Sequence, residues 1–166
     1  MALPRRIARI DVELTRWMAD RGPTLLRISL GIVFFWFGVL KFFPGLSPAD
    51  ALAARTIETL TLGTVGPAAS VPVLAAWECA IGLGLISGVA MRVTILLLLV
   101  QMMGTLTPVF LFPGEVFTRI PYAPTLEGQY IIKNLVLISG ALVLGALVRG
   151  GKVVADPEKV PAELAD

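Results

Sequence analysis

The sequence predicts an all-α membrane protein, a single domain over residues 1–166 built on a four-transmembrane-helix bundle. Two observations lead to this class. The chain is 56% hydrophobic and 16% charged, whereas a soluble domain of this size carries about 25% charged residues. Four apolar segments also have the length of about 20 residues that a helix needs to cross the hydrocarbon core of a bilayer. These segments cover residues 24–43, 71–90, 93–112 and 129–148.

Lysine and arginine are distributed unevenly between the connections. Nine of them lie before the first span, between the second and third spans, or after the fourth, whereas the other two connections hold only Arg55 and Arg119. Because basic residues are enriched on the cytoplasmic side of membrane proteins, we expect both termini to be cytoplasmic. Residues 150–166 are polar and contain two prolines, so we expect a flexible cytoplasmic tail there.

Residues 1–21 carry apolar side chains at helical spacing, with arginines on the other side. This pattern predicts an amphipathic helix that lies on the cytoplasmic leaflet. A frayed soluble tail is the alternative. The apolar residues are Ile7, Ile10, Leu14, Trp17 and Met18.

The connections on the outer side carry distinct helix and turn signals. Ser47-Pro48-Ala49-Asp50 is typical of a helix start, so we expect a short helix over the outer mouth of the bundle. The prolines in residues 113–126 favour an extended segment without helix. Pro108 should kink the third span and free a backbone carbonyl near Gly104.

Four charged residues interrupt or border the apolar segments, namely Arg27, Lys41, Glu78 and Lys133. Each costs about 2.5–3.5 kcal/mol if it stays bare at the centre of a membrane. Arg27 lies near the cytoplasmic start of its span, where it can snorkel to the headgroups or form a pair inside the bundle. The other three belong to different spans but lie at similar depth, within about 10 Å of the outer boundary.

We therefore expect a polar pocket that opens to the outer side, with Glu78 paired to Lys133 or Lys41. It would bind a small ligand with an anionic or quinone-like head group, or relay protons. The alternative is that the pair only neutralises charge and fixes helix register, and Lys41 alone is also typical of an interface anchor. Gln101, at mid-membrane, either extends the pocket or bonds across helices. The other candidates at this depth are Gln129, Asn134, Trp36, Trp77 and Tyr130.

The chain lacks the residue types that several kinds of site require. It has no histidine and a single cysteine, Cys79, which argues against a histidine-containing metal site, a histidine triad, a CxxC pair and an internal disulfide. We expect Cys79 to be a small buried residue, with redox sensing as the alternative. Basic and aromatic residues do not interleave in long runs, so we expect no nucleic-acid partner.

The order of these residues resembles the DoxX superfamily of four-span bacterial membrane proteins over residues 22–150. The resemblance is carried by Arg27, Leu30-Gly31, Gly38 and Lys41-Phe42, by Glu78, Ile81-Gly82, Leu85, Gly88 and Arg92, and by the string from Glu127 to Leu135. That string is similar to the YkgB/RclC-type branch, inner-membrane proteins linked to reactive-chlorine resistance. The resemblance implies location in the bacterial inner membrane, and polar positions at Arg27, Lys41, Glu78, Arg92 and Lys133 without a catalytic assignment.

Some DoxX-type proteins are associated with thiosulfate:quinone oxidoreductase or with membrane complexes that handle oxidative and thiol stress. We therefore expect a protein of redox or oxidative-stress protection whose pocket binds a quinone-like ligand. Two alternatives stay open. One is a scaffold or accessory subunit of a membrane oxidoreductase, and the other is a small-molecule transporter built as a homo-oligomer.

Overall fold

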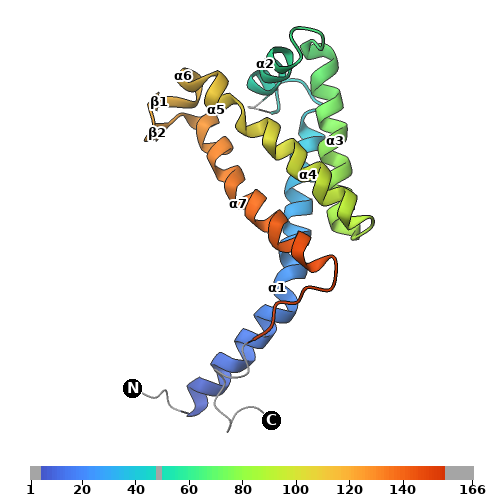
Figure 1. Cartoon of the computed structure of the whole chain (residues 1–166), viewed down its shortest axis with the longest axis vertical. Helices are drawn as coiled ribbons and strands as arrows, with labels where there is room; N and C mark the ends of the chain where they lie inside the picture. The colour runs from blue at the N-terminus through green and yellow to red at the C-terminus, as the bar shows by residue number, and fades with distance from the viewer. Residues whose placement is uncertain (1–4, 48–49, 156–166) are drawn as a thin grey trace.

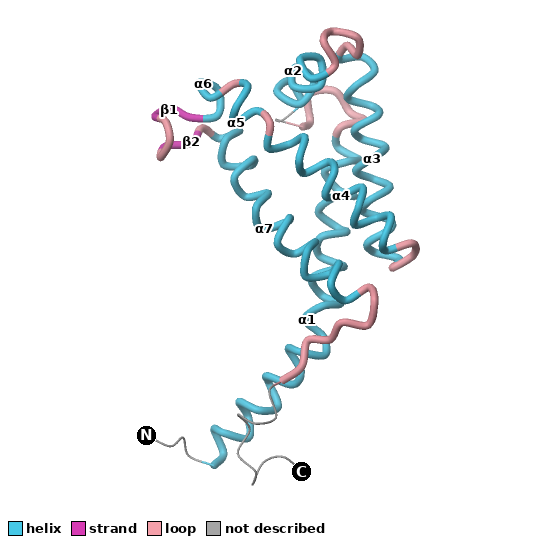
Figure 2. The backbone as a smooth tube through the Cα atoms, in the orientation of Figure 1, coloured by secondary structure: helices cyan, strands magenta, loops and turns pink. Residues whose placement is uncertain are grey.

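The computed structural model describes residues 5–47 and 50–155 (Figure 1). Most of the described chain is helical, and the helices are joined by short loops (Figure 2). The helices are α1 (Arg5–Leu40), α2 (Asp50–Leu60), α3 (Pro67–Ser87), α4 (Met91–Leu106), α5 (Pro108–Leu111), α6 (Pro113–Val116) and α7 (Leu126–Leu147). The strands β1 (Phe117–Arg119) and β2 (Ala123–Pro124) pair antiparallel.

Within the described residues, four helical segments are long and apolar enough to cross a membrane. They cover residues 9–40, 67–87, 91–111 and 126–147. The four-span helical bundle expected from the sequence is thereby confirmed, whereas the cytoplasmic location of the termini stays a prediction. We call the end of the bundle that carries α2 the α2 end, and the opposite end the terminal end.

Helix α1 differs from the prediction of an amphipathic helix at residues 1–21 followed by a separate span. It runs without interruption from Arg5 to Leu40 and contains Pro23. Pro23 removes one backbone hydrogen bond, but helix propagates from both sides at little cost once it is nucleated. The first part of α1 extends beyond the bundle (Figure 1), and its apolar side chains, such as Ile10 and Trp17, are more than half exposed. Its placement on a membrane surface stays a prediction.

Two predicted segments include residues outside the described ranges. The predicted short helix is present as α2, but Pro48 and Ala49 of its expected start lie outside the described residues. Of the predicted tail, residues 151–155 have no regular structure, and 156–166 lie outside the description as well.

The segment 113–126 is not the extended loop that its prolines suggest. Pro113 occupies the first turn of the short helix α6, where its missing N–H has no partner to lose. Val116 at the end of α6 is fully buried, and its carbonyl accepts a 2.9 Å hydrogen bond from the Thr125 N–H. Pro113 thus starts a helix and Pro124 belongs to a strand, so the prolines do not keep the whole segment extended.

Pro108 interrupts the third span as expected, because α4 ends at Leu106 and α5 begins at Pro108. The expected free carbonyl at Gly104 is wrong. That oxygen accepts hydrogen bonds from the backbone N–H of Thr107 at 3.2 Å and from the Thr107 hydroxyl at 2.6 Å. A threonine one residue before the proline therefore satisfies the group that the proline would otherwise leave bare.

Small residues bring α1 and α3 into close contact along most of their shared length. A Cβ added at Gly82 would lie 2.5 Å from the Phe35 nitrogen, and one added at Gly38 would lie 2.8 Å from the Cys79 nitrogen. The apolar core lies next to this contact and includes Leu30, Phe34, Ile81, Leu85 and Leu98. The bundle is therefore packed around the α1–α3 contact, and the buried pair of Lys41 and Glu78 lies at the end of this contact nearer α2.

Candidate functional site

Lys41 and Glu78 form an ion pair inside the bundle. The distance from Lys41 Nζ to Glu78 Oε2 is 2.7 Å, and both side chains are at least nine-tenths buried. Lys41 follows directly after α1, whereas Glu78 lies in the middle of α3. Removing two charges from water is unfavourable unless they meet in good geometry. The lysine that pairs with Glu78 is thus Lys41. The sequence alone also favours this residue as an interface anchor.

The close approach of α1 and α3 explains why Lys41 reaches Glu78. A Cβ at Gly38 would lie 2.9 Å from the Glu78 Cβ and 2.9 Å from the Cys79 sulfur. Only a glycine lets the two backbones come this near without displacement. Lys41 lies three residues after Gly38, on the same side of the chain, so the contact that glycine permits also places the ammonium over the carboxylate.

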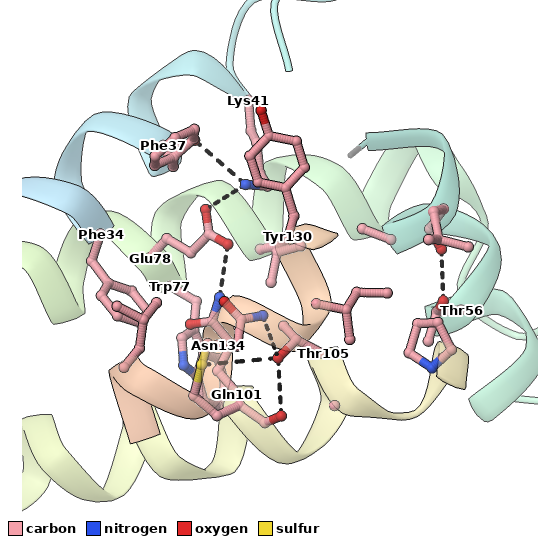
Figure 3. A pocket seen from close by; sticks show the side chains of 18 of the residues that line it. Phe34, Phe37, Lys41, Thr56, Trp77, Glu78, Gln101, Thr105, Tyr130 and Asn134 are labelled. Carbon is pink, nitrogen blue, oxygen red and sulfur yellow. Dashed lines mark hydrogen bonds and ion pairs between the residues drawn. The ribbon is translucent and has the colours of Figure 1, made fainter. Parts of the chain in front are cut away.

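Gln101 of α4 completes the group on the other side of the carboxylate. Its Nε2 donates a 2.7 Å hydrogen bond to Glu78 Oε1, so each oxygen of Glu78 has its own donor (Figure 3). Gln101 is more than nine-tenths buried. Its Oε1 is buried and has no hydrogen-bond partner within the described residues. We call Lys41, Glu78 and Gln101 the polar trio.

A cavity of about 540 Å³ lies beside the polar trio, within the range of sizes typical of small-molecule sites. Its walls are mostly apolar and come from α1, α2, α3, α4 and α7. The lining side chains include Val33, Phe34, Phe37, Trp77, Tyr130 and Lys133. Figure 3 shows Tyr130 and Asn134 of α7 among the side chains that line the cavity.

Lys133 lines this cavity but is not the partner of Glu78. It is exposed, and its ammonium lies 5.8 Å from the centre of the Tyr130 ring. Among the described residues, no carboxylate lies within ion-pair distance of it. Its neighbour Asn134 donates a 3.4 Å hydrogen bond to the Thr105 hydroxyl of α4. The α7 wall therefore keeps a cation in contact with the cavity instead of neutralising it.

Two residues expected in the pocket lie away from it. Gln129 and Trp36 are exposed and line no part of the cavity, whereas their chain neighbours Tyr130 and Phe37 do. Adjacent residues of a helix point about 100° apart, so depth in the membrane alone could not tell the two members of each pair apart. Trp77 does line the cavity, and its Nε1 donates a 3.2 Å hydrogen bond to the Leu97 carbonyl.

Some lining residues were not among the candidates, and helical spacing could have found them. Phe37 and Phe34 precede Lys41 by four and seven residues, which places them on the face of α1 that carries the lysine. The lining residues of α2 include Leu52, Thr56 and Leu60, and they repeat at the same spacing. The cavity is thus enclosed by the facing sides of several helices, and the polar trio forms part of its wall.

Arg27 does not line this cavity and has a separate contact. Its Nη1 donates to the carbonyls of Leu85 and Ile86, the latter at 3.0 Å. These carbonyls belong to the last turn of α3, where backbone oxygens lack partners and a cation is favourable. Arg27 thus holds the terminal end of α3 against α1, the structural alternative to snorkelling.

The chain matches a known protein family over the region that holds the polar trio. The family model named DoxX matches residues 22–113, more than half of the chain. The matched region contains the whole polar trio and Arg27, whereas α7 with Tyr130 and Lys133 lies outside it. Comparison with curated proteins and with solved structures gave no match. With four apolar spans and this match, the chain is a multi-pass membrane protein that belongs to the DoxX family.

Proposed function

We propose that this protein acts in redox or oxidative-stress protection by binding a quinone-like small molecule in the cavity beside the polar trio. The observation that carries the proposal is a buried ion pair and a buried amide placed in the wall of an apolar cavity. Ionisable groups inside membrane helices mark ligand or proton sites more often than the same groups in soluble proteins. The stress role rests on the resemblance of residues 127–135 to proteins linked to reactive-chlorine resistance.

The charges of the cavity favour a ligand without net charge. Its charged lining residues are Lys41, Glu78, Glu127 and Lys133, two basic and two acidic. An anionic or cationic ligand would leave an unbalanced charge in a largely apolar space, which is unfavourable. A ring with two oxygen substituents and an apolar tail fits both the walls and this balance.

Gln101 suggests how the head of such a ligand is recognised. Its Oε1 has no partner among the described residues, and an unsatisfied buried acceptor costs about 1–3 kcal/mol. A hydroxyl of a ligand in its reduced form would donate to this oxygen. A ligand carbonyl would instead accept a hydrogen bond from Lys41, whose ammonium has three donors.

Tryptophan fluorescence can test binding, because the chain offers a matched pair of reporters. Trp77 lines the cavity, whereas Trp36 is 64% exposed and lies outside it. We expect a decyl-substituted benzoquinone to quench Trp77 saturably in a nanodisc-embedded variant with Trp17→Phe and Trp36→Phe. The matched variant that keeps Trp36, with Trp17→Phe and Trp77→Phe, should show only unsaturable quenching. Equal, unsaturable quenching of both tryptophans would refute the binding proposal.

Side-chain substitutions refine the same test. Gln101→Met should weaken binding of the probe severalfold, whereas Gln129→Met, on the exposed face of α7, should leave it unchanged. In cells that lack the native chain, Glu78→Gln should abolish survival of hypochlorite exposure while the protein still accumulates. Glu58→Gln, an exposed position of α2 outside the cavity lining, is the matched control and should protect normally. Full protection by Glu78→Gln would contradict the assigned role.

A second candidate function is that of an accessory subunit in a membrane oxidoreductase. The observation that favours it is the first part of α1, which extends beyond the bundle with half-exposed apolar side chains. If this role holds, purification in mild detergent should yield a stoichiometric oxidoreductase partner that Ile10→Asp and Leu14→Asp release. A partner-free protein that still binds the quinone probe would contradict it.

A further inference from the structure

Helices α1 and α7 meet at one end of the bundle and separate toward the other. Near the terminal end, a Cβ added at Gly140 would lie 3.2 Å from Leu30 and 3.3 Å from Leu26. Toward the α2 end the two helices diverge, as Figures 1 and 2 show. The Gly140–Leu30 contact is therefore the closed corner of a wedge between the two helices.

The cavity beside the polar trio occupies this wedge. Val33 and Phe37 line it from α1, and Tyr130 and Lys133 line it from α7. All four side chains are exposed, Phe37 by 43% and Tyr130 by 42%. They lie within the apolar spans 9–40 and 126–147. Because these side chains lie within two apolar spans, the wedge would face acyl chains in a bilayer.

The α2 end of the cavity is covered by protein instead. Thr56 of α2 lines the cavity and is 4% exposed. Arg55 of the same helix forms an ion pair with Glu115 of α6 and lies 4.4 Å from the centre of the Phe112 ring. These contacts hold α2 against the segment after α4. Helix α2 therefore lies between the cavity and the water at this end of the bundle.

We infer that the cavity is loaded sideways from the bilayer, through the wedge between α1 and α7, with a neutral molecule dissolved in the lipid. The inference deepens the proposed function and rests on it. The balanced charges of the lining argue against a headgroup with net charge, and the apolar α1 side of the wedge, with Val33 and Phe37, matches an isoprenoid or alkyl tail. The tail would stay in the wedge while the oxygen-bearing head reaches Gln101 and Lys41.

The variant that keeps only Trp77 provides the test. Two benzoquinone probes are compared in nanodiscs: one with a decyl chain, which partitions into lipid, and one with a sulfonate, which stays in water. We expect saturable quenching by the decyl probe alone. Equal binding of the sulfonated probe would overturn the inference.

Two neighbouring positions separate the wedge from the rest of the membrane surface. Val33 lines the cavity, whereas Ile32 is half exposed and does not. Val33→Phe should slow association of the decyl probe severalfold, and Ile32→Phe should leave the rate unchanged. Equal rates for both variants would contradict entry through the wedge.

The outcomes distinguish the inference from the function on which it rests. Saturable quenching by both probes would retain the binding site and overturn lateral loading. Quenching by neither probe beyond the Trp36 control would overturn both. If instead a second copy of the chain fills the wedge, Val33→Cys in a Cys79→Ser background would crosslink into dimers on mild oxidation, and that result would also overturn lateral loading.

Discussion

The two sides of α1 differ in how they meet their neighbours. Toward α3, glycines 31, 38 and 82 bring backbones together so closely that an added Cβ at any of them would lie 3.0 Å or less from the other helix. We call this the closed side. Toward α7, the aromatic and charged side chains Phe37, Tyr130 and Lys133 line a cavity, and we call this the open side. Small residues thus hold the bundle together, and bulky residues border the space in which a ligand would bind.

The polar trio lies where the two sides meet, and this position explains how its residues are brought together. Lys41 and Glu78 are brought together by the closed side, yet both line the cavity of the open side. Packing alone therefore fixes the pair before any ligand arrives. A preformed site spends less ligand-binding energy on ordering side chains.

The largest effect is expected from separating Lys41 from Glu78. Lys41→Met leaves a buried carboxylate without its cation, which destabilises a protein by about 3–5 kcal/mol. Lys133→Met, on the open side, removes an exposed cation beside Tyr130 and should change stability by less than about 1 kcal/mol. Unfolding in detergent, followed by intrinsic fluorescence, measures both. Equal losses for the two lysines would contradict the distinction between the sides.

A double variant sharpens this comparison. Lys41→Met combined with Glu78→Gln removes both charges together, so it should be more stable than Lys41→Met alone. Additive losses in the same unfolding measurement would mean that the two side chains do not interact.

The second effect concerns the glycines of the closed side. Gly82→Ala places a Cβ 2.5 Å from the Phe35 nitrogen, which is backbone and cannot rotate away. We expect a loss of up to about 3 kcal/mol from this overpacking. Gly104→Ala has no atom within 4 Å of the added Cβ and should instead gain a few tenths of a kcal/mol to about 1 kcal/mol. Melting temperatures in one detergent compare the two, and an unchanged Gly82→Ala protein would contradict the packing.

A smaller loss should follow from removing Arg27 at the terminal end. Arg27→Met deprives the last turn of α3 of a charged donor, and we expect a loss of about 1.5–2 kcal/mol. Arg92→Met at the exposed start of α4 is the control and should stay within about 0.5 kcal/mol of the wild type. Hydrogen exchange of the α3 amides should rise in Arg27→Met only. Equal exchange in both variants would mean that Arg27 does not hold this helix end.

The smallest effect is expected over the cavity, at the ion pair of Arg55 with Glu115. Both side chains are about half exposed, so Glu115→Gln should lower stability by only about 0.2–1 kcal/mol. The loss should shrink at high salt, because ions screen exposed pairs. Thermal unfolding at two salt concentrations checks this, and a salt-independent loss above this range would show that the pair is more buried than its exposure indicates.

Features that depend on one segment alone could be predicted from the sequence. Each span is set by its own length and hydropathy, and the break at Pro108 is set by the missing N–H of proline. Depth in the membrane also follows from position along a span, which is why Glu78 was expected to meet a lysine. Depth alone could not identify the lysine that pairs with Glu78. Lys41 and Lys133 lie at similar depth, but their side chains point in different directions around their helix axes.

Direction around a helix axis depends on packing between segments, and there the sequence was insufficient. The close approach at Gly38 selects Lys41 over Lys133. The same lack of direction placed Trp36 and Gln129 in the pocket. The continuity of α1 through Pro23 and the short helix α6 also differ from prediction, since a single proline can end, bend or begin a helix depending on its neighbours.

The ion pair is most directly measured by solid-state NMR on the protein in liposomes, with ¹⁵Nζ-lysine and ¹³Cδ-glutamate labels. We expect a dipolar coupling between one lysine ammonium and one carboxyl carbon, of the size expected from the 2.7 Å Nζ–Oε2 contact. That coupling should disappear in Lys41→Met and persist in Lys133→Met. A coupling that survives Lys41→Met, or the absence of any such coupling in the wild type, would contradict the ion pair between Lys41 and Glu78.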